Sequence, residues 1–429
     1  MNYKENILKI ITECCRVLVG GVFIFSGITK AIDPTGGAIK IEEYLNAFGL
    51  EMLSPLSMLA SLNLSAIEFT LGVCLLLGAY RKYASLLSLI LMGFMTPLTL
   101  YLAVFDPVSD CGCFGDALVV TNWETFFKNV VLLAAIIFAF LNNRRMTALY
   151  SFKVIWFIPL YAYIFSLAFS YYNYSHLPII DFRPYKVGEN IPSLMTIPEG
   201  AEEDEYRYSF IYEKEGVQKE FSLEELPDDP AWEFVDSNTE LIKKGYEPPV
   251  SAFNLYNLFG DDVTDILFEN SDGVFLLIAH KLEKASEERI DEINNLYDYA
   301  VDNGLLFYGV TASSFDEINR WTDYTGAEYP FLMADDVLLK TIVRSNPGLV
   351  LLRGGTILGK WNYRDIPGEE NLTEVMESAL KGDRINQKED ALIMFFILTF
   401  AVPLLLVWVY DWFRTRRKEK TVQSKPTEA

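Results

Sequence analysis

Two of the five cysteines, Cys111 and Cys113, are close enough in sequence to form a redox pair. They flank Gly112, which lacks a Cβ and so permits the tight backbone that such a small disulfide ring requires. Strained, exposed disulfides exchange readily with other thiols. We therefore expect an exchange-active pair. Two alternatives remain open: both thiols are packing residues of a re-entrant loop, or each pairs with another chain.

The carboxylates that flank this pair, Asp110 and Asp116, oppose thiol chemistry. A nearby negative charge disfavours the thiolate, so each should raise the thiol pKa and slow the attack on a disulfide. The other cysteines, Cys14, Cys15 and Cys74, fall within apolar segments. We expect them to be reduced, buried packing residues.

Lys30 and Glu68 are the second candidate, because each is a charge within or at the end of a long apolar segment. Ionisable residues in a membrane are costly to bury and are therefore frequently functional. Both should lie in the outer half of adjacent helices, which allows an ion pair. Two interpretations are open: a polar site below the cysteine loop for a proton or a quinone headgroup, or a structural pair that pins two helices together. The structural pair is slightly favoured, because pairing alone removes the penalty of burying the charges.

Several classes of site are excluded. The two histidines, His176 and His280, and the two-cysteine loop lack the spacing of a four-ligand zinc site, so no metal is predicted. No hydrolase triad, phosphate-binding loop or dinucleotide-binding motif is present. The net charge is −22, and phosphate contacts need clustered Lys and Arg, so no nucleic-acid partner is expected.

Six segments are apolar and long enough to span a bilayer. They are residues 8–28, 56–79, 83–105, 126–141, 154–171 and 391–412. With six spans, the basic residues before the first segment, in the second and fourth loops and in the tail 413–429 share one side. The positive-inside rule places that side, with both termini, in the cytoplasm.

Residues 172–390 then face outward, and they contain 44 acidic and 19 basic residues. In a bacterial inner (plasma) membrane this side is the oxidising periplasm. Residues 185–250 are predicted to form a β-rich lead-in. Residues 263–380 alternate strands and helices, which predicts an α/β sandwich with a mixed sheet. Gly354-Gly355 is a hairpin signal.

The membrane part, over residues 8–145, resembles the DoxX/MauE-type four-helix family. The similarity rests on residues 20–30, on Glu68 with Gly72 and Gly78, and most specifically on Cys111-Gly112-Cys113-Phe114-Gly115. It implies that residues 1–150 form a four-helix bundle, here with two further transmembrane helices, and act in disulfide formation or protein maturation with quinone as the acceptor. The bundle also resembles vitamin K epoxide reductases, whose Cys-x-x-Cys is missing here.

Residues 263–380 resemble a thioredoxin-like domain of the TlpA kind, by strand order and by Ser345-Asn346-Pro347 before a strand. In that family this proline is cis and faces the redox site. The Cys-x-x-Cys expected after Ala279 is replaced by His280-Lys281-Leu282-Glu283, so this domain cannot exchange dithiols. The resemblance implies instead that a surface around His280 and Pro347 binds a periplasmic client or partner protein.

Two functions of different classes fit these observations. In the first, the chain is a thiol–disulfide or quinone oxidoreductase, or a subunit of one, that uses Cys111, Cys113, Lys30 and Glu68. In the second, it is a non-catalytic scaffold or assembly subunit of the envelope, as the cysteine-free thioredoxin-like domain suggests.

Overall fold

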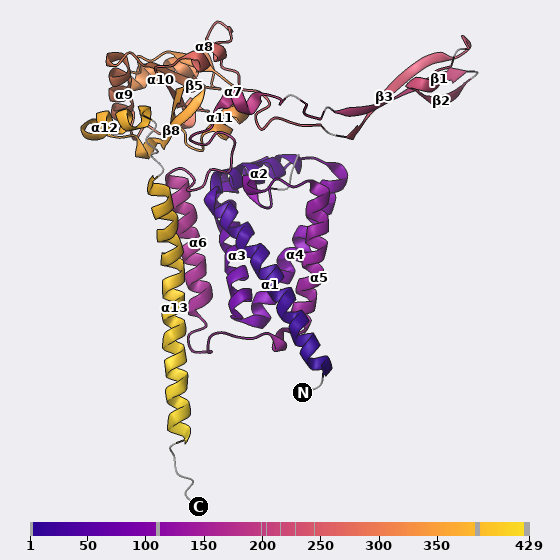
Figure 1. Cartoon of the computed structure of the whole chain (residues 1–429), viewed down its shortest axis with the longest axis vertical. Coiled ribbons are helices and arrows are strands. Elements are labelled where there is room, and N and C mark those ends of the chain that lie inside the picture. The colour runs from indigo at the N-terminus through magenta and orange to yellow at the C-terminus, as the bar shows by residue number, and fades with distance from the viewer. Residues whose placement is uncertain are drawn as a thin grey trace, which may run out of the picture.

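The computed structural model describes residues 3–108, 112–198, 200–202, 204–214, 216–227, 229–243, 245–381 and 387–423. Long helices form an upright bundle, with a sheet-containing domain and a projecting arm at one end (Figure 1). The bundle helices are α1 (Tyr3–Ile32), α3 (Ser57–Leu77), α4 (Arg81–Phe105), α5 (Asn122–Leu141), α6 (Phe157–Ser175) and α13 (Gln387–Gln423).

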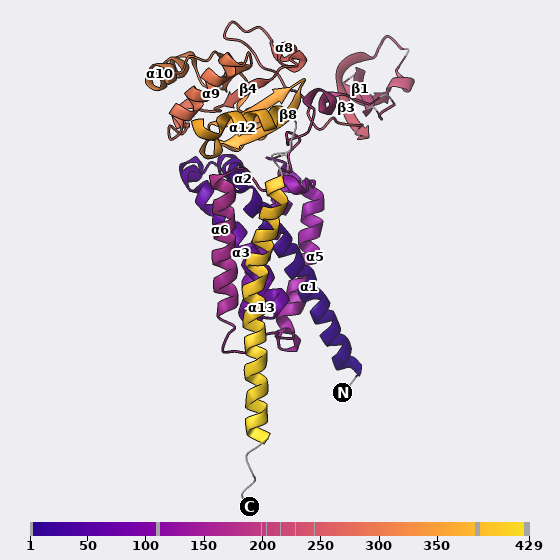
Figure 2. The same cartoon turned by 60° about the vertical axis from the view of Figure 1, so that its left-hand side comes forward.

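Four described helical stretches are long and apolar enough to cross a membrane: Glu51–Leu77, Arg81–Phe105, Asn122–Leu141 and Asp390–Thr415. The expected first and fifth spans are α1 and α6, which run alongside these helices but are more polar (Figure 2). Charged residues occupy the first half of α1, and α6 contains five tyrosines. A membrane-helical part is therefore confirmed, whereas the number of six spans stays a prediction.

Small residues bring α1 and α3 into close contact. A Cβ added at Gly27 would lie 2.6 Å from the backbone nitrogen of Phe69, and one added at Gly72 would lie 2.7 Å from that of Ile24. Such close approach of two backbones is typical of helix pairs in membranes. It sets the half of α1 nearer the sheet-containing domain directly against α3.

Aromatic side chains join α13 to α6. The rings of Phe165 and Phe400 have centroids 4.8 Å apart, as do those of Phe169 and Phe396. α13 is longer than the predicted segment 391–412 and extends past the bundle at the end away from the domain (Figure 1).

A short helix that the sequence did not predict, α2 (Pro34–Ala47), lies at the end of the bundle nearest the domain (Figure 1). Asp33 is its N-cap and accepts a hydrogen bond from the Gly36 backbone nitrogen at 2.8 Å. Proline at the first helical position fits this start, because its missing N–H would be unpaired there anyway.

The outer domain contains a five-stranded mixed sheet in the order β6-β5-β4-β7-β8. Its strands are β4 (Val274–Ile278), β5 (Leu306–Thr311), β6 (Phe331–Met333), β7 (Gly348–Arg353) and β8 (Thr356–Asn362). β4, β5 and β6 are parallel, whereas β7 is antiparallel to β4 and β8. This order, with a cis peptide bond between Asn346 and Pro347 just before β7, is the thioredoxin-like arrangement.

Helices cover both faces of this sheet. One core contains side chains from α9 (Ile290–Asp302), α10 (Phe315–Thr325) and α12 (Glu369–Leu380). The opposite core contains side chains from α7 (Ile191–Met195), α8 (Thr264–Glu269) and α11 (Asp336–Ile342). An α/β sandwich is thus confirmed.

Part of the predicted lead-in belongs to this sandwich. Tyr185, Ile191 and Val250 are buried in the second core, as is Phe253 just beyond the lead-in, and the Ile191 backbone nitrogen donates to the Gly355 carbonyl oxygen at 2.9 Å. The domain therefore draws on residues before 263. Apolar side chains that cover a sheet can come from any part of the chain, which strand order alone does not reveal.

The remainder of the lead-in is an arm that projects sideways from the domain (Figure 1). It is a three-stranded antiparallel sheet, in the order β2-β1-β3, of β1 (Glu205–Lys214), β2 (Val217–Ser222) and β3 (Glu233–Lys243). Aromatic rings gather on one face, where Tyr212 lies 5.9 Å from Phe221 and 5.7 Å from Phe234 between centroids.

Candidate functional site

A buried ion pair forms the centre of the candidate site. Lys30 of α1 places its Nζ 2.8 Å from both carboxylate oxygens of Glu68 on α3. The two side chains are only 11% and 8% exposed. Charged side chains that are this buried require a close partner of opposite charge, and here Lys30 and Glu68 are each other's partner.

Ser26, one helical turn before Lys30, connects this pair to the cysteine loop. Its Oγ lies 2.7 Å from Glu68 Oε2, 2.7 Å from the carbonyl oxygen of Cys113 and 3.2 Å from Lys30 Nζ. A hydroxyl has one proton to donate. Ser26 can therefore donate either to Glu68 or to the Cys113 backbone, but not to both at once.

The cysteine loop is held over this pair by its neighbours. Gly112 has a φ of +59°, and a Cβ added there would lie 3.0 Å from Cγ of Lys40 on α2. The Phe114 ring packs edge-on against Phe25 at 5.2 Å, and Lys128 Nζ lies 4.0 Å from its centroid. Glycine is thus favoured at position 112 by its left-handed backbone angle and by the close approach of the Lys40 side chain.

Cys111 and Asp110 lie outside the described residues. Of the predicted thiol pair, the structure therefore places Cys113 alone, and it places it above Lys30 and Glu68.

An apolar cavity of about 280 Å³ adjoins Cys113 on the membrane side. Its walls come from α2, α3 and α4, and Lys30, Gly112 and Cys113 close one end. The aromatic side chains in the wall are Tyr44, Phe48 and Phe94.

A second cavity, of about 550 Å³, lies between the bundle and the outer domain and is called here the outer chamber. It is lined by α2, by the loop residues Gly112, Gly115 and Asp116, and by α11 with Arg344. Lys30 borders both this chamber and the apolar cavity. The region around Cys113 therefore separates a polar space from an apolar one.

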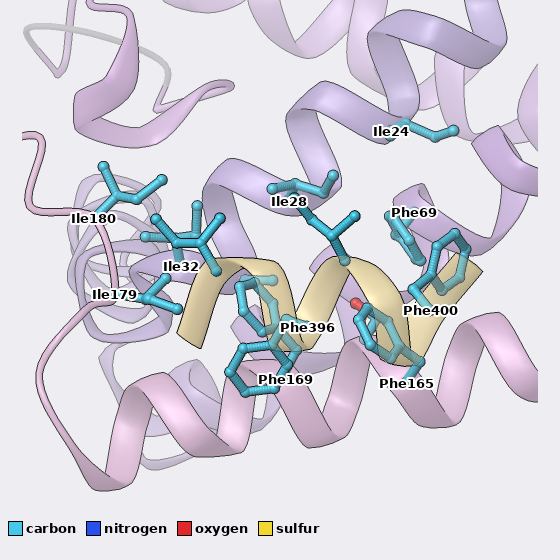
Figure 3. Close-up of a pocket in the computed structure, with 14 residues that line it drawn as sticks. Ile24, Ile28, Ile32, Phe69, Phe165, Phe169, Ile179, Ile180, Phe396 and Phe400 are labelled. Carbon is cyan, nitrogen blue, oxygen red and sulfur yellow. The ribbon is translucent and has the colours of Figure 1, made fainter. Parts of the chain in front are cut away.

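A third cavity, of about 330 Å³, lies between α1, α3, α6 and α13 and has only isoleucine, phenylalanine, alanine and serine in its wall. Figure 3 shows Ile28, Phe165 and Phe396 directed toward it. It has neither a cysteine nor a charged group in its wall, so it does not belong to the candidate site.

His280 follows β4, where a thioredoxin would have its cysteines, and the loop after it contacts the cis-proline loop. The amide Nδ2 of Asn346 donates to the Lys281 carbonyl oxygen at 2.8 Å. Burial, and next the charge of Lys340, lower the pKa of His280 to about 4. Among the described residues that line the outer chamber, neither His280 nor Pro347 is present.

The other cysteines lie apart from this site. Cys74 is buried in the bundle core, as expected. Cys14 is exposed and Cys15 is half-buried, which corrects the expectation that both are buried. Among the described residues, no group of three His, Cys, Asp or Glu side chains lies close enough to hold a metal ion.

Sequence reasoning missed three residues of the site: Ser26, Asp33 and Arg344. Arg344 lies 3.0 Å from Asp33 and 2.9 Å from Asp116, and so joins the outer domain to the bundle. The first pair is separated by 311 positions, so no local pattern could reveal it. Asp33-Pro34 was a readable helix-start signal.

Comparison with known proteins gives separate matches for the helical bundle and for the arm. Residues 8–142 match the model of the family described as methylamine utilisation protein MauE. Residues 206–244, the arm, match a domain of unknown function, DUF8463. No curated protein matches this chain.

A candidate protein disulfide isomerase from Bacteroides thetaiotaomicron is 18% identical to this chain. The match covers 30% of this chain and 86% of that one, with a TM-score of 0.24. The fold of the outer domain is read from its own strand order, not from this match. The chain thus joins a membrane-helical part that is similar to the MauE family to a thioredoxin-like domain that contains no cysteine.

Proposed function

We propose that this protein is a thiol–disulfide oxidoreductase of a bacterial inner membrane, or a subunit of one, and acts through Cys111 and Cys113 on the periplasmic side. One observation chiefly supports this: Cys113 lies directly over the Lys30–Glu68 pair, where a polar chamber and an apolar cavity meet. A protein that passes electrons from a water-soluble thiol to an acceptor in the membrane needs such a boundary.

The proposed reaction balances without a metal. A client thiolate attacks one sulfur of the oxidised Cys111–Cys113 pair, and the second client thiol breaks the resulting mixed disulfide. The client leaves oxidised, and Cys111 and Cys113 are left as two thiols. Their reoxidation releases two electrons and two protons, which a membrane quinone would accept to become quinol.

The apolar cavity beside Cys113 suits a quinone ring better than the other cavities do. Tyr44, Phe48 and Phe94 offer ring faces, and Lys30 is a donor at the end nearest Cys113. Aromatic walls with a few convergent polar groups are typical of cofactor sites. These residues would hold the ring, and the cysteine lies in the same wall.

Ser26 and Glu68 give the site a place for a proton. As a carboxylate, Glu68 accepts hydrogen bonds from Lys30 and Ser26. Once protonated at Oε2, it becomes a donor to Ser26, whose own proton then turns to the Cys113 carbonyl oxygen. Proton uptake at Glu68 would thereby change a hydrogen bond to the backbone of the reacting loop.

The outer domain would bind the client. Its loops at His280 and Pro347 correspond to the surface with which thioredoxin-like domains hold polypeptides, and it has no cysteine with which to react itself. The client is then a periplasmic protein with a pair of thiols.

The test uses the full-length protein in lipid nanodiscs, with a reduced dithiol peptide and a short-chain quinone. Wild type should oxidise the peptide with one quinol formed per disulfide. Cys113→Ser should abolish turnover, and Cys14→Ser, which changes an exposed cysteine away from the site, should not. Equal turnover by Cys111→Ser/Cys113→Ser would refute the proposal.

The second candidate, a non-catalytic envelope scaffold, is favoured by the arm. Tyr206, Tyr208 and Phe234 are exposed on its sheet, and exposed aromatic groups of this size mark interaction surfaces. Deletion of residues 205–243 should then cost more function in cells than Cys111→Ser/Cys113→Ser. The reverse ranking would favour the oxidoreductase.

A further inference from the structure

Arg344 is the residue through which the outer domain holds the bundle. It lies between α11 and β7, close to the cis-proline loop, and its side chain is 10% exposed. Its Nε donates to Asp33 Oδ2 at 3.0 Å, its Nη2 donates to Asp116 Oδ2 at 2.9 Å, and its Nη1 donates to the Lys340 carbonyl oxygen at 2.9 Å. One guanidinium therefore joins three elements.

Asp33 is the more firmly held of the two carboxylates, because Asp116 is 40% exposed. Asp33 is 9% exposed, and its other oxygen, Oδ1, caps α2. Asp116 lies in the short helical turn Gly115–Ala117, three residues after Cys113. A planar guanidinium that binds two carboxylates is a directional contact, which a flexible ammonium reproduces poorly.

The charge of Arg344 should also affect how readily the Cys113 thiol ionises. An unopposed carboxylate at Asp116 would disfavour a thiolate in the same loop. Arg344 opposes that carboxylate, and because it is buried its charge is weakly screened by salt. Although burial lowers the pKa of Arg344, Asp33 and then Asp116 raise it above its ordinary value, so it stays charged.

Other charged groups surround the loop from every packed element. They are Lys30 of α1, Lys40 and Glu43 of α2, Glu68 of α3 and Lys128 of α5. These are bundle residues and stay in place whether or not the outer domain is docked. Arg183, Lys340 and Arg344 also line the outer chamber, and all three come from the part of the chain that packs on the bundle with the outer domain. Of the three, Arg344 forms the ion pair with Asp116 of the loop.

We propose that Arg344 is a positioning residue for Cys113: it fixes the loop through Asp116 and offsets the charge of that carboxylate, three residues from the Cys113 thiol. This rests on the proposed function. Docking of the outer domain and reactivity of the bundle's thiols are thereby coupled, so a client bound to one part meets a loop that is ready to react.

The test is the pH dependence of Cys113 alkylation by iodoacetamide in reduced, full-length protein in nanodiscs, followed on the Cys113 peptide by mass spectrometry. Arg344→Gln should shift the profile to higher pH and slow alkylation at pH 7 by about tenfold, the change that one pKa unit produces. Arg344→Lys should restore part of the rate. Arg353→Gln is the matched control, because the partners of Arg353 among the described residues are the carbonyl oxygens of Asp272 and Leu380 in the outer domain.

Asp116→Asn distinguishes an electrostatic role from a structural one. Alone it should speed alkylation, and added to Arg344→Gln it should return the profile to that of wild type or lower pH. An unchanged profile in Arg344→Gln, or no recovery in the double variant, would overturn the proposal. This readout needs neither client nor quinone, so it fails or succeeds independently of the overall reaction.

Discussion

A cis-proline framework and a cysteine loop, which a thioredoxin combines in one fold, lie in two different parts of this chain. The outer domain keeps the framework: the strand order, the cis bond before Pro347 and the Asn346–Lys281 hydrogen bond between its two loops. It has His280 where the reacting group should be. The bundle has the reverse, a cysteine loop over a buried ion pair and no sheet.

Under the proposed function, the framework that binds the client and the group that reacts with it belong to two different folds. A thioredoxin places cysteines beside its cis-proline so that a bound peptide meets a thiol at once. Here the chain would achieve the same by docking, with Arg344 of the outer domain bound to Asp116 of the cysteine loop. We infer that the outer domain binds the client and that the bundle carries out the thiol chemistry.

The largest effect should come from the group that forms bonds. Cys113→Ser removes a nucleophile and should lower the kcat for client oxidation by at least about 1,000-fold. His280→Ala alters the binding half, so it should raise KM and leave kcat nearly unchanged. Steady-state kinetics on a dithiol peptide checks both predictions. A fall in kcat for His280→Ala would contradict the proposal that the outer domain acts in client binding alone.

The next effect concerns the buried pair. Glu68→Gln keeps the shape and removes the proton acceptor, so quinone-dependent reoxidation should slow by about 100-fold. Reduction of the pair by client should change much less. Stopped-flow measurement separates the two half-reactions, and Glu13→Gln, which changes a carboxylate paired with Arg16 instead, serves as the control. Equal slowing of both half-reactions would assign Glu68 a structural role.

A smaller effect tests the packing that holds the pair together. Gly27→Ala inserts a Cβ 2.6 Å from the Phe69 backbone and should destabilise the bundle by about 1–3 kcal/mol. Gly21→Ala on the same helix has nothing within 4 Å of the new Cβ and should be neutral. Thermal unfolding in detergent compares them, and equal Tm values would show that α1 and α3 are not in close contact.

The smallest expected effect is the loss of stability when His280 becomes protonated. With a pKa of about 4, it should remain neutral at pH 5, where an ordinary histidine is charged. The unfolded chain takes up this proton at higher pH than the folded one, so stability should fall as the pH drops from 6.5 toward 4. The chain has two histidines, so ¹³C-histidine NMR with His176→Gln assigns the signal. Titration near pH 6.5 would contradict the burial.

Much of the fold could be predicted because its signals are local. Gly354 and Gly355 both have positive φ, as a two-residue hairpin turn requires, and Ser314 caps α10 through the Glu317 backbone nitrogen. The long apolar runs in the sequence predicted the helices α3, α4 and α5 just as directly. Each of these depends on residues that are neighbours in sequence.

The candidate site was less accessible from sequence. Lys30 and Glu68 stand out because a charge is costly in a membrane, but Ser26 has no such signal among many serines. Asp33 and Arg344 meet only when the outer domain docks. Sequence therefore predicts which groups are unusual, and the packing of distant elements decides what they contact.

The most direct test of the central claim is labelling of Cys111 and Cys113 in intact cells by a membrane-impermeant maleimide, with and without prior reductant. A redox-active pair on the outer side should stay unlabelled in untreated cells and be labelled at both positions after reduction, without permeabilisation. Labelling without reductant would show that the pair is not held oxidised. Labelling only after permeabilisation would place it on the cytoplasmic side, and either result would contradict the account.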